Sequence, residues 1–193
     1  MTGRPRAFDL DERLECAMRV FWRHGYEGTA LSDLTAAMGI NRPSLYAAYG
    51  NKEALFGLCL DHYHRGPARH VHEALAAPTA RAVAERLLRG TVEVVTRPEG
   101  PGCLLVHGAL ATGPGSAAVR ADATARRARS RARLRQRLEQ AADTGDLPPG
   151  TDPAALADYL STLTYGLAVQ AADGTPAPHL LRTAEYALRV WPA

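Results

Sequence analysis

The sequence predicts an all-α fold, and three observations support this expectation. Apolar residues recur at spacings of three, four and seven along most of the chain, which is the pattern of helices that bury one face. No stretch shows the strict alternation of apolar and polar residues that indicates a half-buried strand. Glycine and proline interrupt the pattern where helices can end. We therefore expect about nine helices, divided between a unit at residues 1–50 and a second at 51–193.

Composition and charge limit the class of protein. The chain has 193 residues and a formal net charge of +3, which is compatible with nucleic-acid binding but does not require it. Its three cysteines are widely spaced and odd in number, so we expect no disulfide framework and a reducing, cytoplasmic location. No run approaches the roughly 20 apolar residues of a membrane span, so no membrane partner is expected.

The N-terminal residues predict a flexible basic arm followed by a first helix. Residues 1–7 have no helical period and include two arginines, Arg4 and Arg6. Asp9 and Glu12 then form an Asp-x-x-Glu pair of the kind that begins a helix. The apolar stripe of this helix consists of Leu10, Leu14, Met18 and Phe21.

Residues 29–52 have the pattern of two short helices joined by a tight turn. Gly39 can adopt the left-handed conformation that ends the first of them. Asn41 can cap the second, and Pro43 lies in its first turn, where a missing N–H costs nothing. The apolar stripe of the first helix consists of Leu31, Leu34 and Met38. This pattern is that of a helix-turn-helix.

The second of these helices has a buried face and an outward face. Leu45 and Tyr49 lie four residues apart and are predicted to enter the core. The outward face carries hydrogen-bond donors and small side chains, namely Arg42, Ser44, Tyr46 and Ala47. Such a face suits the major groove of DNA, where each base pair presents a distinct pattern of donors and acceptors.

Residues 51–193 predict a series of further helices. A fourth helix begins at Asn51 and ends near Gly66, or continues with a kink to Ala76. The helix predicted at 116–142 is rich in arginines that spread around it, which favours a solvated surface over a DNA-binding ridge. The last two helices have broad apolar stripes and are natural dimer elements. Their predicted interface residues are Leu156, Leu160, Leu167, Leu181, Ala184, Leu188 and Trp191.

Three runs of residues, 21–29, 34–41 and 44–56, resemble the N-terminal DNA-binding domain of the TetR family of bacterial transcriptional regulators. They contain Phe-x-x-x-Gly-Tyr-x-x-Thr, the turn Met-Gly-Ile, and Ser-Leu-Tyr-x-x-Tyr-Gly-Asn-Lys-Glu-x-Leu. The resemblance implies a homodimeric regulator, usually a repressor, that binds a palindromic operator in double-stranded DNA. It also implies that the C-terminal helices bind a small-molecule effector and that the last two helices form the dimer interface.

The same resemblance implies roles for individual residues in DNA binding. Thr29 matches a threonine that caps the second helix and touches phosphate. Lys52 matches a lysine that holds a phosphate together with a helix N-terminus. Tyr46 matches a tyrosine that contacts the DNA backbone or a base. The variable positions that read bases correspond to Arg42, Pro43 and Ser44.

Two of the DNA-binding assignments leave alternatives open. The Arg42 guanidinium can pair with guanine O6 and N7, or it can contact a phosphate or solvent. Arg4 and Arg6 can enter the minor groove beside the site, or they can belong to a tail without a role in binding.

A mostly apolar cavity among the C-terminal helices is the expected ligand site. Family topology and helix faces place seven residues in its wall, namely His62, Leu87, Thr91, Leu104, His107, Tyr159 and Leu163. Only Cys103 and His107 share a helix face, whereas a zinc site needs three or four ligands, so we expect no metal or other cofactor. No recognisable catalytic motif occurs, so no enzyme is expected. The alternative function is an architectural or dimerising DNA-binding protein without a small-molecule effector.

Overall fold

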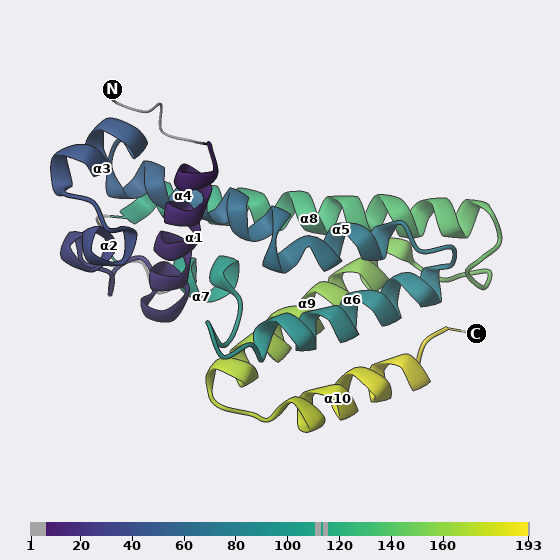
Figure 1. The fold of residues 1–193 in the computed structure, drawn as a ribbon. Helices are drawn as coiled ribbons and strands as arrows, with labels where there is room; N and C mark the ends of the chain where they lie inside the picture. Colours follow the sequence, from purple (N-terminus) through teal and green to yellow (C-terminus); the bar gives the residue numbers. More distant parts are fainter. Residues whose placement is uncertain (1–6, 111–112, 114–115, 193) are drawn as a thin grey trace.

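The computed structural model describes residues 7–110, 113 and 116–192, and every regular element among them is helical (Figure 1). The all-α prediction is therefore confirmed. The N-terminal elements are α1 (Ala7–His24), α2 (Leu31–Met38), α3 (Arg42–Tyr49) and α4 (Lys52–Arg65). A 3-10 turn (Pro67–Arg69) leads into the remaining elements, namely α5 (His70–Leu75), α6 (Ala80–Val95), α7 (Leu104–Leu110), α8 (Ala117–Asp143), α9 (Pro153–Ala172) and α10 (Ala177–Arg189).

Local hydrogen bonds and one left-handed residue explain why the chain turns where it does between α2 and α4. Gly39 adopts the left-handed conformation, with φ of 63°, at the end of α2. Asn41 accepts a hydrogen bond from the Ser44 amide at 2.9 Å and so caps α3. Asn51 accepts one from the Ala54 amide at 2.7 Å and caps α4 in the same way. The predicted helix-turn-helix is present, with the caps that the sequence indicated.

The three N-terminal helices close around a core that α4 completes. The largest fully buried side chains of this core include Phe21, Leu34, Leu45, Leu55 and Phe56. The Phe21 and Phe56 rings meet edge to face, with centroids 5.0 Å apart, which ties α1 to α4. From this core α4 extends toward the C-terminal helices (Figure 1). The domain boundary expected after residue 50 stays a prediction. The helix that follows this position, α4, still contributes side chains to the core of the first unit.

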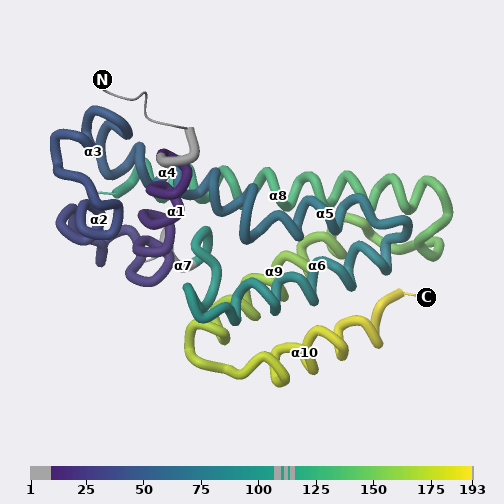
Figure 2. Tube along the Cα trace, viewed as in Figure 1, coloured from purple at the N-terminus to yellow at the C-terminus, as the bar shows by residue number. Residues whose placement is uncertain are grey.

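The C-terminal helices form a second core around α6. This helix packs against α5, α9 and α10, while α8 extends from the N-terminal unit along α9 (Figures 1 and 2). Fully buried leucines of this core include Leu88, Leu138, Leu160, Leu167 and Leu180. A span of the lipid bilayer cannot be built from any helix in the described part of the chain, because none is both long and apolar enough.

The predicted fourth helix is interrupted rather than merely kinked. Gly66 and Pro67 end α4 at Arg65, and the chain continues through the 3-10 turn into the short α5. This break brings His70, the first residue of α5, directly onto Gly90 of α6. A Cβ atom at Gly90 would lie only 2.8 Å from the His70 ring, so glycine permits this close approach of the two helices.

The seven residues predicted at a dimer interface pack in or against the subunit's own core, and their contact with a partner stays a prediction. Five are buried, namely Leu160, Leu167, Ala184, Leu188 and Trp191, and the other two, Leu156 and Leu181, pack against the same core. The large apolar side chains exposed on α9, on α10 and directly after α10 are those of Tyr159, Val169, Tyr186 and Val190.

Candidate functional site

The outward face of α3 collects four of the predicted DNA-contacting side chains. Leu45 is fully buried and anchors the helix, whereas Tyr46, the next residue, is 47% exposed. The remaining exposed members of this face are Arg42, Pro43 and Ser44. Asn41 caps the helix at the same end, so the exposed polar side chains lie beside a helix N-terminus. The arrangement can present hydrogen-bond donors to a groove of DNA.

Lys52 lies at the start of α4 and its ammonium group is held in place by an aromatic ring. Its Nζ atom lies 4.5 Å from the centroid of the Tyr26 ring, which is a cation–π distance. Partial burial lowers the pKa of Lys52, and the nearby Glu27 carboxylate opposes that change. The ammonium group and the first turn of α4 thus combine positive charge with the positive end of a helix, which is suited to an anion such as phosphate.

Thr29 does not occupy the position that the sequence predicted for it. Its side chain is only 1% exposed, and its hydroxyl group donates a hydrogen bond to the Gly25 carbonyl at 2.6 Å. The start of α2 is capped by Asp33, which accepts a hydrogen bond from the Ala30 amide at 2.9 Å. The Thr29 side chain therefore joins a turn instead of capping α2, and its contact with phosphate stays a prediction. Two other predicted contacts, Arg4 and Arg6, lie outside the described residues.

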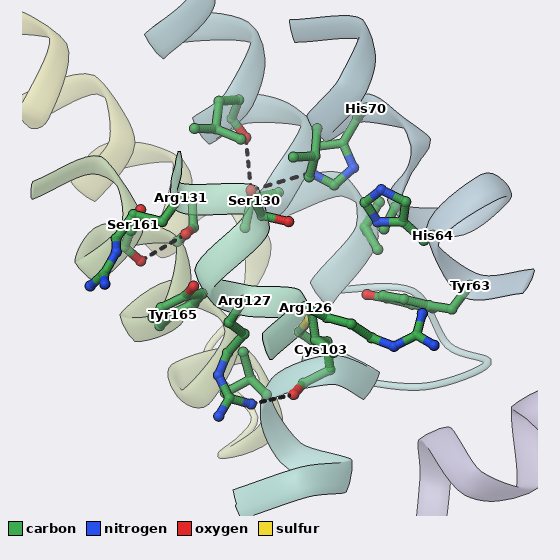
Figure 3. Close-up of a pocket in the computed structure, with 18 of the residues that line it drawn as sticks. Tyr63, His64, His70, Cys103, Arg126, Arg127, Ser130, Arg131, Ser161 and Tyr165 are labelled. Carbon is green, nitrogen blue, oxygen red and sulfur yellow. Dashed lines mark hydrogen bonds between the residues drawn. The ribbon is translucent and has the colours of Figure 1, made fainter. Parts of the chain in front are cut away.

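A cavity of about 290 Å³ lies between α4, α6, α8 and α9, with α5 and α7 at its edges (Figure 3). Its apolar wall includes Leu60, Val71, Leu87, Val95, Val106 and Leu134. The polar side chains that point toward it include His64, His70, Ser130 and Tyr165 (Figure 3). A concave, mainly apolar space with a few polar groups is the usual form of a small-molecule site.

His70 is held neutral inside the cavity wall. The Thr91 hydroxyl donates to the Leu87 carbonyl at 2.7 Å, so its oxygen accepts the bond from His70 Nε2, 3.3 Å away (Figure 3). Burial lowers the pKa of His70 to about 4. The imidazole is therefore an uncharged donor to Thr91 at neutral pH.

Two arginines of α8 join this helix to α4 and α7 beside the cavity. Arg126 of α8 forms ion pairs with Asp61 of α4 and with Asp122, the latter at 2.8 Å. Arg127, the next residue, donates to the Leu105 carbonyl of α7 at 2.9 Å. Three helices around the cavity are thus joined through two adjacent arginines.

A second set of contacts joins the chain around α7 to α1 and the loop after it. The Trp22 indole donates to the Gly102 carbonyl at 3.1 Å in a buried hydrogen bond. Beyond α7, the Glu27 carboxylate accepts hydrogen bonds from the Gly113 amide at 3.0 Å and from the Ser116 hydroxyl. Both bonds lower the pKa of Glu27. Both ends of the segment that contains α7 are therefore tied to the N-terminal unit.

Two of the seven predicted ligand residues, Leu87 and Thr91, lie in the cavity wall. His62 does not line it, because its Nε2 atom lies 2.9 Å from the Glu15 carboxylate of α1. Leu104 is buried in the N-terminal core, Tyr159 is exposed, and Leu163 packs against the C-terminal core. The side chain of His107 lies outside the described residues.

Several lining residues were missed from the sequence. Tyr63 and His64 follow Leu60 at spacings of three and four, which put all three on one face of α4, so this signal was available. Ser130, Tyr165 and Ser161 carried no comparable signal, because their position depends on how α8 and α9 pack.

Comparisons with known proteins agree with this arrangement. Residues 14–59 match the model of the family described as bacterial regulatory proteins, tetR family, and residues 78–184 match that described as tetracyclin repressor-like, C-terminal domain. The HTH-type transcriptional repressor ComR of Escherichia coli K12 is 35% identical, over 98% of this chain and 92% of its own length.

Two solved structures extend the comparison over nearly the whole fold. A cysteine mutant of the TetR family transcriptional regulator CifR, in complex with a 26bp double-strand operator DNA, is 46% identical with a TM-score of 0.91. The match covers 98% of this chain and all of that one. A TetR transcriptional regulator from Rhodococcus sp. RHA1 is 44% identical, with a TM-score of 0.64, over 93% of this chain and 98% of its own.

Proposed function

The chain belongs to the TetR family of bacterial transcriptional regulators, and from this premise we propose that it is a cytoplasmic, ligand-responsive repressor that binds a palindromic operator as a homodimer. The observation that carries the proposal is the outward face of α3. Leu45 and Tyr49 of this helix enter the core, while its N-terminal turn is exposed. The likeness to CifR, which is described in complex with operator DNA, supports placing this face against a duplex.

The proposed DNA contacts divide between base reading and phosphate binding. Arg42 at the start of α3 is our first choice for a base reader, since its guanidinium can pair with guanine O6 and N7. Ser44 and Tyr46, on the same exposed face, would make the neighbouring contacts to bases or backbone, and Pro43 would pack against them. Lys52 would hold a phosphate at the N-terminus of α4.

The proposed control by a ligand runs through α4. Its first half, with Leu55 and Phe56, packs in the core that supports α3, and its second half lines the cavity with Asp61 and His64. A ligand that prefers a different placement of α4 against α8 changes the separation of the two recognition helices in a dimer. Half-sites one turn apart require about 34–36 Å between those helices, so such a shift weakens operator binding.

The proposed dimer surface is the outward face of α9 and α10 rather than the leucines that the sequence indicated. Tyr186 of α10 is 67% exposed, Val190 directly after α10 is 58% exposed, and Tyr159 and Val169 are exposed on α9. These exposed apolar side chains would be covered in a protein–protein contact. Two copies of this helix pair would form a four-helix interface of the kind known for helical bundles.

The proposal is tested by selection of DNA fragments that the purified protein retains, followed by titration of a small-molecule library into the protein–DNA complex. We expect a symmetric binding site and release of the fragment by at least one compound. The alternative of an architectural DNA-binding protein would be favoured if the protein bound DNA without sequence preference and if salt, but no compound, weakened that binding.

A further inference from the structure

The α8 side of the cavity is strongly basic. Five arginines of this helix line the cavity, namely Arg126, Arg127, Arg129, Arg131 and Arg133. Among the lining residues, Asp61 carries the one carboxylate. The sequence indicated arginines spread around α8, and the structure shows that five of them flank the strip of helix that faces the cavity. Ser130 lies in the middle of that strip (Figure 3).

Carboxylates neutralise only part of this positive charge. Arg126 is paired with Asp61 and Asp122, and Arg131 lies 3.5 Å from Asp158 across an exposed surface. In the described part of the chain, the other three lining arginines have no carboxylate partner, and these are Arg127, Arg129 and Arg133. Five arginines and three carboxylates leave two positive charges in excess.

Neutral groups on both sides of the cavity experience this charge. Burial lowers the pKa of His64, and Arg133 and Arg126 lower it further by repelling a proton on the ring. Burial raises the pKa of Tyr165, whereas Arg127 and Arg131 oppose that rise by favouring the phenolate. The arginines therefore favour negative charge at both positions, opposed by Asp61 at His64 and by Cys103 at Tyr165.

The rest of the wall sets the shape and polarity of a ligand. Opposite α8 the wall is mainly apolar, with Leu60, Leu87 and Val95 among its residues. The Ser130 hydroxyl lies between the flanking arginines and can donate a hydrogen bond (Figure 3). The volume of about 290 Å³ is enough for a small organic molecule.

We propose that the cavity binds a small organic anion, a carboxylate with an apolar body, whose head group lies on the arginine side beside Ser130 and whose body lies against the opposite apolar wall. This inference rests on the proposed function, since it specifies the effector of the same site. Cations around a partly enclosed, mostly apolar space act on a bound charge more strongly than they do in bulk water. The cavity should therefore distinguish ligands by the charge of the head group.

Three probes of equal chain length test the inference, namely octanoate, octanamide and octylammonium, which differ in charge. Calorimetric titration of each into the full-length protein at pH 7.5 measures its dissociation constant. We expect octanoate to bind at least tenfold more tightly than octanamide, a difference of about 1.4 kcal/mol, and octylammonium to bind most weakly. The preference should decrease with added salt, because Arg129, Arg131 and Arg133 are exposed to solvent.

A variant and a matched control locate the effect. Arg129→Ala with Arg133→Ala removes two unpaired cations from the cavity and should reduce the preference for octanoate at least threefold. Arg81→Ala with Arg86→Ala removes the same charge from the exposed side of α6 and should leave the preference for octanoate unchanged. The inference would be overturned if octanamide bound as tightly as octanoate or if no probe bound. It would also be overturned if both double variants lost the same share of the preference for octanoate.

Failure of this inference and failure of the proposed function give different results. If octanamide or another neutral compound fills the cavity and releases operator DNA, ligand control stands and the charge selectivity is wrong. If octanoate binds with the expected selectivity but no cavity ligand changes operator affinity, the anion site stands and ligand control is wrong.

Discussion

Replacing Gly90 with alanine should destabilise the protein, although alanine is the better helix former. The change inside a helix contributes about 1 kcal/mol in favour of alanine. Against this, the new Cβ would lie 2.8–2.9 Å from three atoms of His70, and overpacking of this kind costs about 1–3 kcal/mol. The His70 ring is tied to Thr91 and largely buried, so it cannot move aside freely. We expect a net loss of about 1 kcal/mol in the free energy of unfolding.

Urea denaturation followed by tryptophan fluorescence measures this change. Gly57→Ala is the matched control, because a Cβ there meets nothing within 4 Å in the middle of α4, and it should stabilise by about 0.5–1 kcal/mol. Only glycine at position 70 removes all three contacts, because one of them is with the His70 Cβ atom, so Gly90→Ala should be favourable in a His70→Gly background. If Gly90→Ala alone stabilises the protein as much as Gly57→Ala does, the packing of α5 on α6 described here is incorrect.

Three further predictions concern DNA, pH and assembly. Arg42→Ala should cost about 1–3 kcal/mol at one base pair of each half-site in a DNA-selection experiment; uniform weakening at all sites would make Arg42 a phosphate contact. Between pH 6.5 and about 4 the unfolded chain protonates at His70 before the folded protein does, so stability should fall with acid. His70→Asn should remove at most about 3 kcal/mol of that fall in urea titrations, and an unchanged slope would show that His70 is not buried as described. Tyr186→Arg with Val190→Arg should yield single chains in sedimentation and weaken operator binding, whereas an intact dimer would refute the α9–α10 surface.

The helix-turn-helix could be predicted because its determinants are local. Gly39, Asn41 and Asn51 act through hydrogen bonds or backbone conformations within a few residues of themselves. The division of α3 into a buried and an exposed face also follows from the spacing of Leu45 and Tyr49. The cap expected from Thr29 was wrong, because its hydroxyl forms a hydrogen bond with the Gly25 carbonyl of the preceding turn.

The cavity and the dimer surface depend on tertiary packing, so sequence patterns located them poorly. In α9 both faces carry apolar side chains, and the period alone does not show which face meets the subunit's own core. Leu160 therefore was assigned to a partner although it is buried, while Tyr159 was assigned to the cavity although it is exposed. Ser130 and the flanking arginines line the cavity only because α8 packs across α4 and α9.

The central claim is that two α3 helices of a dimer bind one duplex at a fixed separation. Fluorescence anisotropy with a selected operator, and with the same operator lengthened by about 5 base pairs between its half-sites, tests it directly, because half a turn puts one half-site on the opposite side of the helix. The account predicts two chains per duplex on the selected operator and a loss of specific binding on the lengthened one. Equal affinity for both duplexes would contradict it.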